Sequence, residues 1–320
     1  MSQPTVLYFG ASRGVAFAAY SYLAAQRPEL HHVLLLRSPT RFQQSEEYKT
    51  LPADVIQRST YFQGDAHSSE NVREVLRLAS PDLVGIVSSI GFTPPDSLKA
   101  TWSLLVHGLD PADICCRALT ILMTELSLVY PALTTKPKFV LCSSMGMGKK
   151  AHKALAPGLG PMYTLALKAP HVDKIGMEYV MERATLPANP AVPEEASLPR
   201  FTPDRSEVLP HILSREAQDA LPAPFIPASD ICIIRPALLN DGTPKGMSRS
   251  VRTPHDGREK NAKDDKGYRV FQEGLAKHES KGKGLYSICR KDAGHFIAEI
   301  LGGKNADAQM WWGRQPVLGY

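Results

Sequence analysis

A glycine motif between an apolar strand and a helical pattern constrains the fold of this sequence most. Residues 5–9 (TVLYF) have the pattern of a buried strand, and Gly10-Ala-Ser-Arg-Gly14-Val-Ala16 follows at once, opening a helical pattern over residues 14–26. Gly10 permits a tight turn, Gly14 lets the backbone approach a pyrophosphate, and the small Ala16 lets the helix lie close to the strand. The strand before and the helix after favour a phosphate-binding loop over a simple turn.

Short apolar strands alternate with longer helical patterns along much of the chain. The pattern predicts strands over residues 5–9, 32–36, 60–63, 83–88, 138–142 and 230–235. It predicts helices over residues 14–26, 71–79, 111–129, 172–183, 211–220 and 292–301. Strands and helices that alternate in this way imply right-handed crossovers and a parallel sheet with helices on both faces. The sequence therefore predicts an α/β fold with a doubly wound parallel sheet.

The composition is that of a globular protein. The 320 residues, 43% hydrophobic and 22% charged, can bury a full core. The net charge of +5 is spread along the chain, whereas a nucleic-acid-binding protein usually gathers its excess on one element. The sequence has no apolar leader at its N-terminus and no uncharged run of the roughly eighteen residues that span a bilayer. We expect a cytoplasmic protein with neither nucleic-acid nor membrane partners.

The cysteines and histidines do not have the spacing of a metal site. The five cysteines lie in apolar runs without a CxxC pair, which is typical of reduced thiols in the cytosol. The histidines, among them His32 and His171, are scattered, and no pair has ligand spacing on one predicted element. We expect no bound metal, and histidines at the surface or at helix ends.

The end of the second strand indicates which dinucleotide the loop binds. An acid at this position accepts hydrogen bonds from a free ribose 2′-hydroxyl, whereas a cation pairs with a 2′-phosphate. The sequence here reads Leu36-Arg37-Ser-Pro-Thr-Arg41, without an acid. Arg37, together with Arg13 of the glycine loop, therefore favours NADP(H) over NAD(H). The alternative is that Arg37 is a solvated cation at a strand end.

Two more strand ends reach the same edge of the predicted sheet. Gly64-Asp65 follows the third strand, where the carboxylate is placed either to meet the adenine amino group or to cap a helix. Ser88-Ser89-Ile90-Gly91 ends the fourth strand, and its small residues let a cofactor ribose pass over the backbone.

Six ordered motifs resemble the short-chain dehydrogenase/reductase superfamily. They are GASRGVA, LLLRSPTRF, GD, SSIG, FVLCSSMG and IIRPALLNDG, one at the end of each predicted strand. The late segment ICRKDAGHFIAEIL resembles a helix of its extended and atypical, NmrA-like branch. The resemblance covers roughly residues 4–183 and 229–301. It implies a Rossmann domain that binds a nicotinamide nucleotide, with a substrate pocket built by the C-terminal part.

The resemblance also implies roles for individual residues. Arg37 would meet the 2′-phosphate and Asp65 the adenine. The phosphates would lie against Gly10, Ser12, Arg13, Gly14 and Val15, and the ribose against Ser88, Ser89, Ile90 and Gly91. The nicotinamide carboxamide would lie along Pro236, Ala237, Leu238 and Leu239.

The catalytic signature of the family is incomplete in this sequence. The family pairs a Ser after the fifth strand with Tyr-x-x-x-Lys, in which Tyr donates a proton and Lys lowers its pKa and holds the ribose. Ser143 and Ser144 occupy the expected place, but Lys168 stands five residues after Tyr163 instead of four. Lys174 on the next predicted helix resembles the lone Lys of the NmrA-like reductases. Tyr163, a Ser or a substrate group would then complete the proton relay.

The sequence predicts a chain of four parts. Residues 1–184 form the NAD(P)-binding Rossmann domain. Residues 185–228 form a proline-rich insertion or cap, because nine prolines in 186–229 exclude a continuous helix or a central strand; a disordered insertion is the alternative. Residues 229–242 supply the last Rossmann strand and the nicotinamide loop, and residues 243–320 a smaller C-terminal substrate lobe built from long loops.

Two functions fit this interpretation. The first is an atypical NADP(H)-dependent reductase that acts on a small organic carbonyl or unsaturated substrate, as a monomer or homodimer. The second is an NmrA-like sensor that binds NADP(H) without turnover, and a scaffold with an inactive pocket is a third, weaker alternative. A pocket capped by long loops favours the enzyme.

Overall fold

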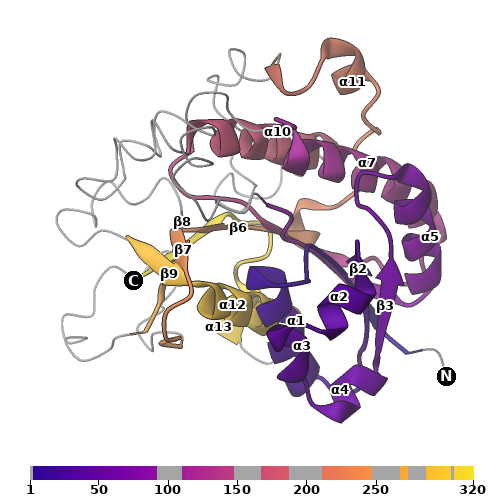
Figure 1. The fold of residues 1–320 in the computed structure, drawn as a ribbon. Helices are drawn as coiled ribbons and strands as arrows, with labels where there is room; N and C mark the ends of the chain where they lie inside the picture. Colours follow the sequence, from indigo (N-terminus) through magenta and orange to yellow (C-terminus); the bar gives the residue numbers. More distant parts are fainter. Residues whose placement is uncertain are drawn as a thin grey trace.

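An eight-stranded sheet forms the centre of the molecule (Figure 1). The computed structural model describes residues 3–91, 110–147, 167–186, 211–246, 267–272, 286–303 and 306–320. The strands follow the order β3 (Ser59–Gln63), β2 (His31–Leu36), β1 (Thr5–Phe9), β4 (Leu83–Ser88), β5 (Lys138–Cys142), β6 (Ile231–Pro236), β10 (Pro316–Gly319) and β8 (Arg269–Gln272). All neighbours are parallel except β8, which is antiparallel to β10. The predicted parallel α/β sheet is confirmed.

Strand β1 marks the point where the chain reverses its direction across the sheet. Tyr8 pairs with Leu34 of β2 on one side and with Val87 of β4 on the other. The chain therefore builds outward from β1 first to β3 and then, in the other direction, to β6. In open parallel sheets the crevice beside such a reversal, at the carboxyl ends of the strands, is where ligands bind.

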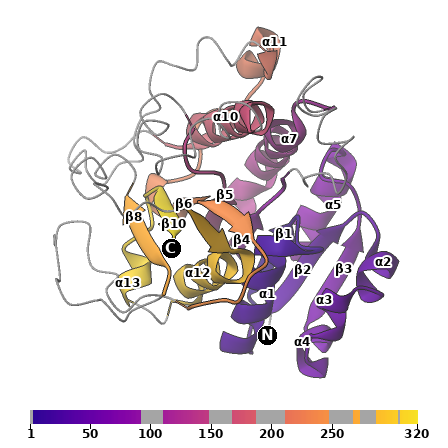
Figure 2. The ribbon, with the colours of Figure 1, turned by 60° about the vertical axis from the view of Figure 1, so that its left-hand side comes forward.

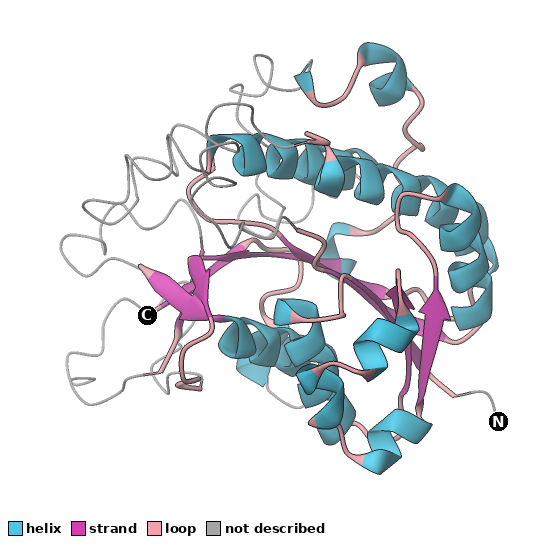
Figure 3. Ribbon diagram, in the orientation of Figure 1, coloured by secondary structure: helices cyan, strands magenta, loops and turns pink. Residues whose placement is uncertain are grey.

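Helices cover both faces of the sheet, as Figures 1 and 3 show. Helices α1 (Gly14–Gln26) and α12 (Arg290–Gly302) lie on one face. Helices α5 (Ser69–Ala79), α7 (Ile114–Val129) and α10 (Lys168–Ala184) lie on the other. Alternate strand residues face opposite layers, so that Tyr8 packs toward α1 and Leu7 toward the α5 side.

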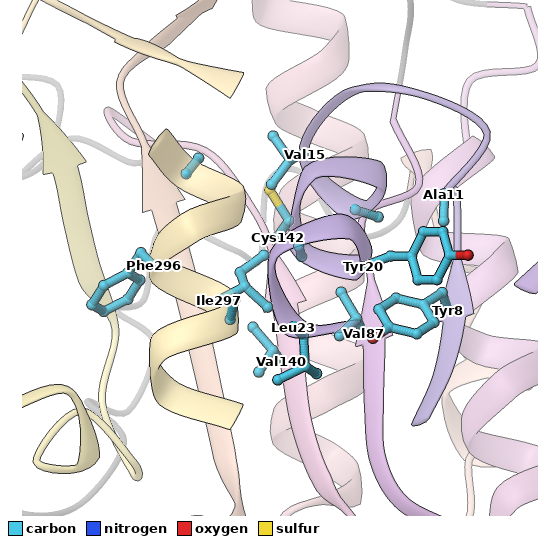
Figure 4. Close-up of a cluster of buried hydrophobic side chains, with 14 of the residues drawn as sticks. Tyr8, Ala11, Val15, Tyr20, Leu23, Val87, Val140, Cys142, Phe296 and Ile297 are labelled. Atoms are coloured by element: carbon cyan, nitrogen blue, oxygen red, sulfur yellow. The ribbon is translucent and has the colours of Figure 1, made fainter. Parts of the chain in front are cut away.

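Helices α1 and α12 approach each other closely through small residues. A Cβ placed on Gly294 would lie 2.4 Å from Cβ of Ala18 and 2.6 Å from the backbone N of Ala19. The two helices share one buried cluster against one face of the sheet (Figure 4). It contains Phe296 and Ile297 of α12 and Val15, Tyr20 and Leu23 of α1. This contact fixes the start of α1, and with it the glycine loop.

Two buried carboxylates attach helix α10 to its neighbours. Asp173 accepts hydrogen bonds from the backbone N–H groups of Cys115 and Cys116 at the start of α7, at 2.8 Å each. One turn later Glu178 forms a bidentate ion pair with Arg235 of β6, with N···O distances of 3.0 and 2.5 Å. Helix α10 is thereby fixed against both α7 and the sheet.

The segment Ile114–Ala132, which is α7 with the adjoining 3-10 turn η1 (Tyr130–Ala132), is long and apolar enough to cross a membrane by length and composition. Half of it is buried inside the molecule. It packs between α5 and α10, and the core helix of a soluble protein meets the same criterion.

Several short elements lie outside the predicted pattern. Between β2 and β3, where the sequence predicts no helix or strand, the structure has α2 (Pro39–Gln43), α3 (Glu46–Lys49) and α4 (Ala53–Gln57). Strands β7 (Leu238–Asn240) and β9 (Ser287–Cys289) form a separate parallel pair. The remaining short helices are α11 (Arg215–Asp219), η5 (Ala228–Asp230) and α13 (Ala306–Gln309).

The C-terminal part is joined to the main body (Figure 2). Strand β10 extends the central sheet, and α12 packs on α1, so these described residues beyond 243 contribute to the α/β core. Trp311 is buried against Phe296. Most of the predicted insertion, residues 187–210, lies outside the described residues.

The expectation that the histidines lie at the surface or at helix ends is wrong for two of them. His32 is fully buried on β2, where its Nδ1 is 3.0 Å from the hydroxyl of Tyr8. His171 is buried on α10. His32 precedes the apolar run of residues 33–36 on a buried strand, and burial of the strand carries the imidazole inside.

Candidate active site

The glycine loop has the geometry that a close ligand approach needs. Gly10 and Gly14 have φ values of 77° and 74°, which L side chains rarely adopt. A Cβ on Gly10 would lie 2.7 Å from the carbonyl oxygen of Ser89, so the loop also abuts the end of β4. Among the described residues no side chain caps α1, and Ser12 and Arg13 are exposed. The first amides of α1 can therefore bind an anion.

A shallow pocket of about 500 Å³ lies at the ends of β2 and β3. Its lining consists of Arg37, Gln63, Gly64, Asp65 and Asn71. A guanidinium and a carboxylate thus line one pocket together with two side-chain amides. Cationic and amide groups of this kind recognise phosphate and heteroaromatic amines through charge-assisted and neutral hydrogen bonds.

Asp65 has a local structural role that the sequence did not settle. Its Oδ1 accepts a hydrogen bond from the backbone N–H of His67 at 2.9 Å, while its own N–H donates to the amide oxygen of Asn71 at 3.0 Å. The cap of α5 is Ser68, whose hydroxyl accepts from the N–H of Asn71. Asp65 therefore forms a turn before the helix instead of capping it, and its side chain stays half exposed at the pocket.

Lys174 joins the ends of β4 and β5. Its Nζ donates hydrogen bonds to the carbonyl oxygens of Ile90 at 2.8 Å and Cys142 at 2.9 Å. Burial by itself lowers the pKa of Lys174, but the coulombic attraction of neighbouring groups, among them the carboxylate of Asp173, raises it above its ordinary value. The ammonium is therefore charged at neutral pH and lies at the carboxyl ends of β4 and β5.

The two serines after β5 have different surroundings. Ser143 is buried, and its hydroxyl is 3.9 Å from the sulfur of Met147. Ser144 is half buried, and its hydroxyl lies 3.2 Å from Nε2 of His171. Ser144 is therefore the more accessible hydroxyl of the two, and it is paired with an imidazole.

The end of β6 closes the same edge of the sheet. The carbonyl oxygen of Pro236 accepts from the N–H of Met145 at 3.1 Å, and Ala237 donates to Leu318 at 2.8 Å. Pro236 and Ala237 are buried, whereas Leu238 is 40% exposed and Leu239 is half buried. The loop predicted to run along a carboxamide thus presents one apolar side chain to the outside.

The predicted site residues form a continuous line along the carboxyl edge. The line runs from the Arg37 pocket through Gly10 and Ser89 to Ile90, Lys174, Ser144 and Pro236. Ser88 is buried within β4, and Gly91 is the last described residue of that loop. Tyr163 lies outside the described residues.

Sequence reasoning missed three residues of this site. Gln63 and Asn71 line the Arg37 pocket, and their positions directly before Gly64-Asp65 and in the first turn of the next helix were the available signals. His171 is among the histidines expected at the surface or at helix ends, although it precedes Lys174 by three positions and so shares a helix face with it.

Comparison with known proteins gives one similar curated sequence. The chain is 27% identical to "Reductase pytE" of Aspergillus terreus over 183 residues, which is 55% of this chain and 66% of that protein. The match thus spans just under two thirds of the reductase. No protein-family model matches the sequence.

Solved structures of the same general architecture align with low identity. A Rossmann-fold NAD(P)-binding family protein of Shigella flexneri aligns at 11% identity and a TM-score of 0.45, covering 99% of this chain and 94% of that one. A dehydrogenase/reductase of Sinorhizobium meliloti aligns at 13% identity and 0.46, with the same coverage. A short-chain dehydrogenase of Streptomyces avermitilis aligns at 16% and 0.43, covering 75% and 67%.

The fold itself rests on the sheet. The order β3-β2-β1-β4-β5-β6, the parallel pairing and the glycine loop after β1 are the features that define a doubly wound dinucleotide-binding sheet. The chain is a Rossmann-fold α/β protein with sequence similarity to a fungal reductase.

Proposed function

We propose that this protein is an NADP(H)-dependent reductase of the atypical short-chain dehydrogenase/reductase type. The observation that carries the proposal is the position of Lys174. Its ammonium lies at the carboxyl ends of β4 and β5, where it donates hydrogen bonds to the carbonyl oxygens of Ile90 and Cys142. Ile90 directly follows Ser89, whose carbonyl lies against Gly10 of the glycine loop. A fixed cation at this point can hold a ribose hydroxyl and stabilise negative charge that develops on a substrate oxygen.

Different residues of the carboxyl edge would bind different parts of the dinucleotide. The first amides of α1 would hold the pyrophosphate, Arg37 the 2′-phosphate, and Asp65 with Asn71 the adenine amino and ring nitrogens. When bound, the nicotinamide supplies or accepts a hydride. The absence of an acid after β2 favours the phosphorylated cofactor, because an acid there would repel the 2′-phosphate.

The substrate we propose is a small organic carbonyl or unsaturated compound. Leu238 and Tyr286 are 40% and 47% exposed, and Leu238 pairs in register with Ser287, the neighbour of Tyr286. Together they offer an apolar surface directly after β6 that suits the carbon skeleton of such a compound. The hydroxyl of Ser144 offers a donor for its oxygen.

We also propose a cytoplasmic location and a monomeric or homodimeric state. All five cysteines are buried and free, as expected of a protein in a reducing compartment. Burial raises the pKa of the Cys115 thiol to about 12, which leaves this thiol protonated and unreactive.

The test is a fluorescence titration of the purified protein with NADPH and with NADH, followed by NADPH consumption with a panel of carbonyl compounds. We expect tighter binding of NADPH and consumption with at least one compound. Binding of neither nucleotide would contradict the proposal. NADPH binding without consumption across the panel would favour the sensor alternative.

A further inference from the structure

The pairing of Ser144 with His171 is a feature that the cofactor site does not require. The hydroxyl and Nε2 are 3.2 Å apart, and His171 is only 8% exposed. Ser144 follows β5, whereas His171 lies in the first turn of α10, so two separate elements bring them together. A half-buried hydroxyl against a buried imidazole is an arrangement that can pass a proton.

His171 and Lys174 point to the same edge of the sheet. They are three residues apart on α10, which places them on one face of the helix. Lys174 contacts the carbonyl of Cys142, and Ser144 lies two residues further on. The imidazole, the hydroxyl and the ammonium therefore surround the segment that follows β5.

The charged groups near His171 are mostly occupied by other partners. On its own helix, Asp173 is bonded to the amides of α7 and Glu178 to Arg235 of β6. Lys174 is bonded to Ile90 and Cys142. Among the described groups on α7, β5 and β6, the thiols of Cys115, Cys116, Cys142 and Cys232 all have raised pKa values because of burial and stay neutral. Ser144 is thus the described polar group that meets Nε2.

We propose that Ser144 is the proton donor of the reductase and that His171 is the positioning residue that resupplies its proton. This inference rests on the proposed function. A bound nicotinamide would supply the hydride to the carbonyl carbon, and the substrate oxygen, which gains the C=O π pair, would take the proton of the Ser144 hydroxyl. Ser144 recovers a proton from Nε2 of protonated His171, and the neutral imidazole is reprotonated by water. The carbonyl is reduced to an alcohol and NADPH is oxidised to NADP⁺, with one proton consumed.

The first arm of the test needs no cofactor. The titration of the His171 ring is followed by NMR in protein labelled at histidine Cε1, and the signal is assigned by its loss in His171→Gln. We expect Ser144→Ala to move the titration midpoint of His171, because the imidazole loses its hydrogen bond with the Ser144 hydroxyl. An unchanged midpoint would show that the pair is absent and would overturn the inference.

The second arm measures the pH dependence of kcat for NADPH consumption with a carbonyl compound that the wild type turns over. We expect His171→Gln to lower kcat about 100-fold and to remove the fall in rate at high pH, because glutamine can hold Ser144 but cannot deliver a proton. Ser144→Ala should do the same. A wild-type rate and profile in His171→Gln would overturn the inference.

Two controls distinguish a failure of the proposed function from a failure of the Ser144–His171 inference. His31→Gln changes a histidine at the opposite end of the sheet, where its Nε2 lies 2.9 Å from the Thr60 hydroxyl, and should leave the profile unchanged. NADPH titration of each variant should give a Kd within about threefold of wild type, since neither residue is expected to hold the nucleotide. Loss of NADPH binding in the wild type would count against the proposed function, whereas intact binding with a wild-type profile in His171→Gln counts against the pair alone.

Discussion

The two ends of the candidate site are built in opposite ways. The end at β2 and β3, the adenosine end, is a shallow pocket lined by Arg37, Gln63, Gly64, Asp65 and Asn71. The end at β4 and β5, the reaction end, consists of Lys174, Ser144 and His171, whose polar atoms already bond to one another or to the backbone. At the adenosine end Asp65 and Asn71 bond to each other and to the local backbone, but the Asp65 carboxylate stays half exposed and open to a ligand. The reaction end is instead joined across separate elements before a ligand arrives.

This contrast separates affinity from chemistry. Exposed charged side chains gain most of their interaction energy when a ligand binds, so substitutions at the adenosine end should change Kd. Groups held in place in advance act on charge that develops during the reaction, so substitutions at the reaction end should change kcat. Substitutions at the two ends test this division.

Lys174→Ala should lower kcat about 1000-fold, because it removes a fixed cation from the reaction end. NADPH affinity should fall much less. The measurement is NADPH consumption alongside a binding titration. Lys168→Ala, an exposed lysine of the same helix, is the matched control and should retain its rate. If Lys174→Ala turned over at the wild-type rate, the chemistry would lie elsewhere.

Arg37→Ala should weaken NADPH binding about 100-fold and leave NADH binding within about threefold. The physical reason is that only NADPH carries the 2′-phosphate that the guanidinium would pair with. Parallel titrations with both nucleotides measure this difference, and Arg77→Ala on α5 is an exposed control. Equal losses for the two nucleotides would contradict the assignment of the adenosine end to NADP(H).

Lowering the pH should weaken the strands beneath the adenosine end through His32. Burial lowers the pKa of His32 from 6.5 to about 3, so the folded protein keeps it neutral while the unfolded chain binds a proton below pH 6.5. The contribution of His32 to stability is therefore complete above pH 6.5 and is lost as the pH falls toward 3. Between pH 7 and 5 this loss should be about 2 kcal/mol in the free energy of unfolding.

Urea unfolding of the wild type and of His32→Asn at both pH values isolates this contribution. The asparagine oxygen can replace Nδ1 as the partner of the Tyr8 hydroxyl, which lies 3.0 Å from Nδ1, but it does not titrate. We expect the variant to lose less stability than the wild type on acidification. Equal losses in the two proteins would mean that His32 is not the group responsible.

Asp65→Asn should have the smallest effect, about a fivefold weakening of NADPH and NADH alike. The amide oxygen can still accept the hydrogen bond from the N–H of His67, so the turn before α5 is kept. The change removes only the charged acceptor for the adenine amino group. Unchanged affinity for both nucleotides would restrict Asp65 to its role in the turn.

Most of the sheet was predictable because local pattern and tertiary position agree there. Residues 5–9, 83–88 and 138–142 were predicted with their observed bounds, since buried parallel strands are continuous apolar runs. Helix α10 begins at Lys168 rather than at the predicted Val172. The prediction missed the first turn because it carries Pro170 and His171 and has no apolar periodicity. Strand β10 was missed because its pairing with β6 is long-range.

The site was predictable only where one strand end determines a role. Arg37 and Asp65 lie at the carboxyl edge because they follow β2 and β3. Lys174 reaches the same edge from helix α10 through its hydrogen bond to Ile90. The Ser144–His171 pair was not predictable, because its geometry depends on how α10 is fixed to α7 and β6 by Asp173 and Glu178. Such contacts between distant segments leave no local pattern.

The tight contact between α1 and α12 has a consequence for the order in which the molecule can be completed during synthesis. Gly294 lies against Ala18, so the helix that follows the glycine loop finds its partner only after about 275 further residues have left the ribosome. Until then the small-residue face of α1 has no cover, although β1 to β4 can already pair. We therefore expect nascent chains that end before residue 286 to expose this face and to need chaperone protection, and the dinucleotide loop to be completed among the last features of the fold.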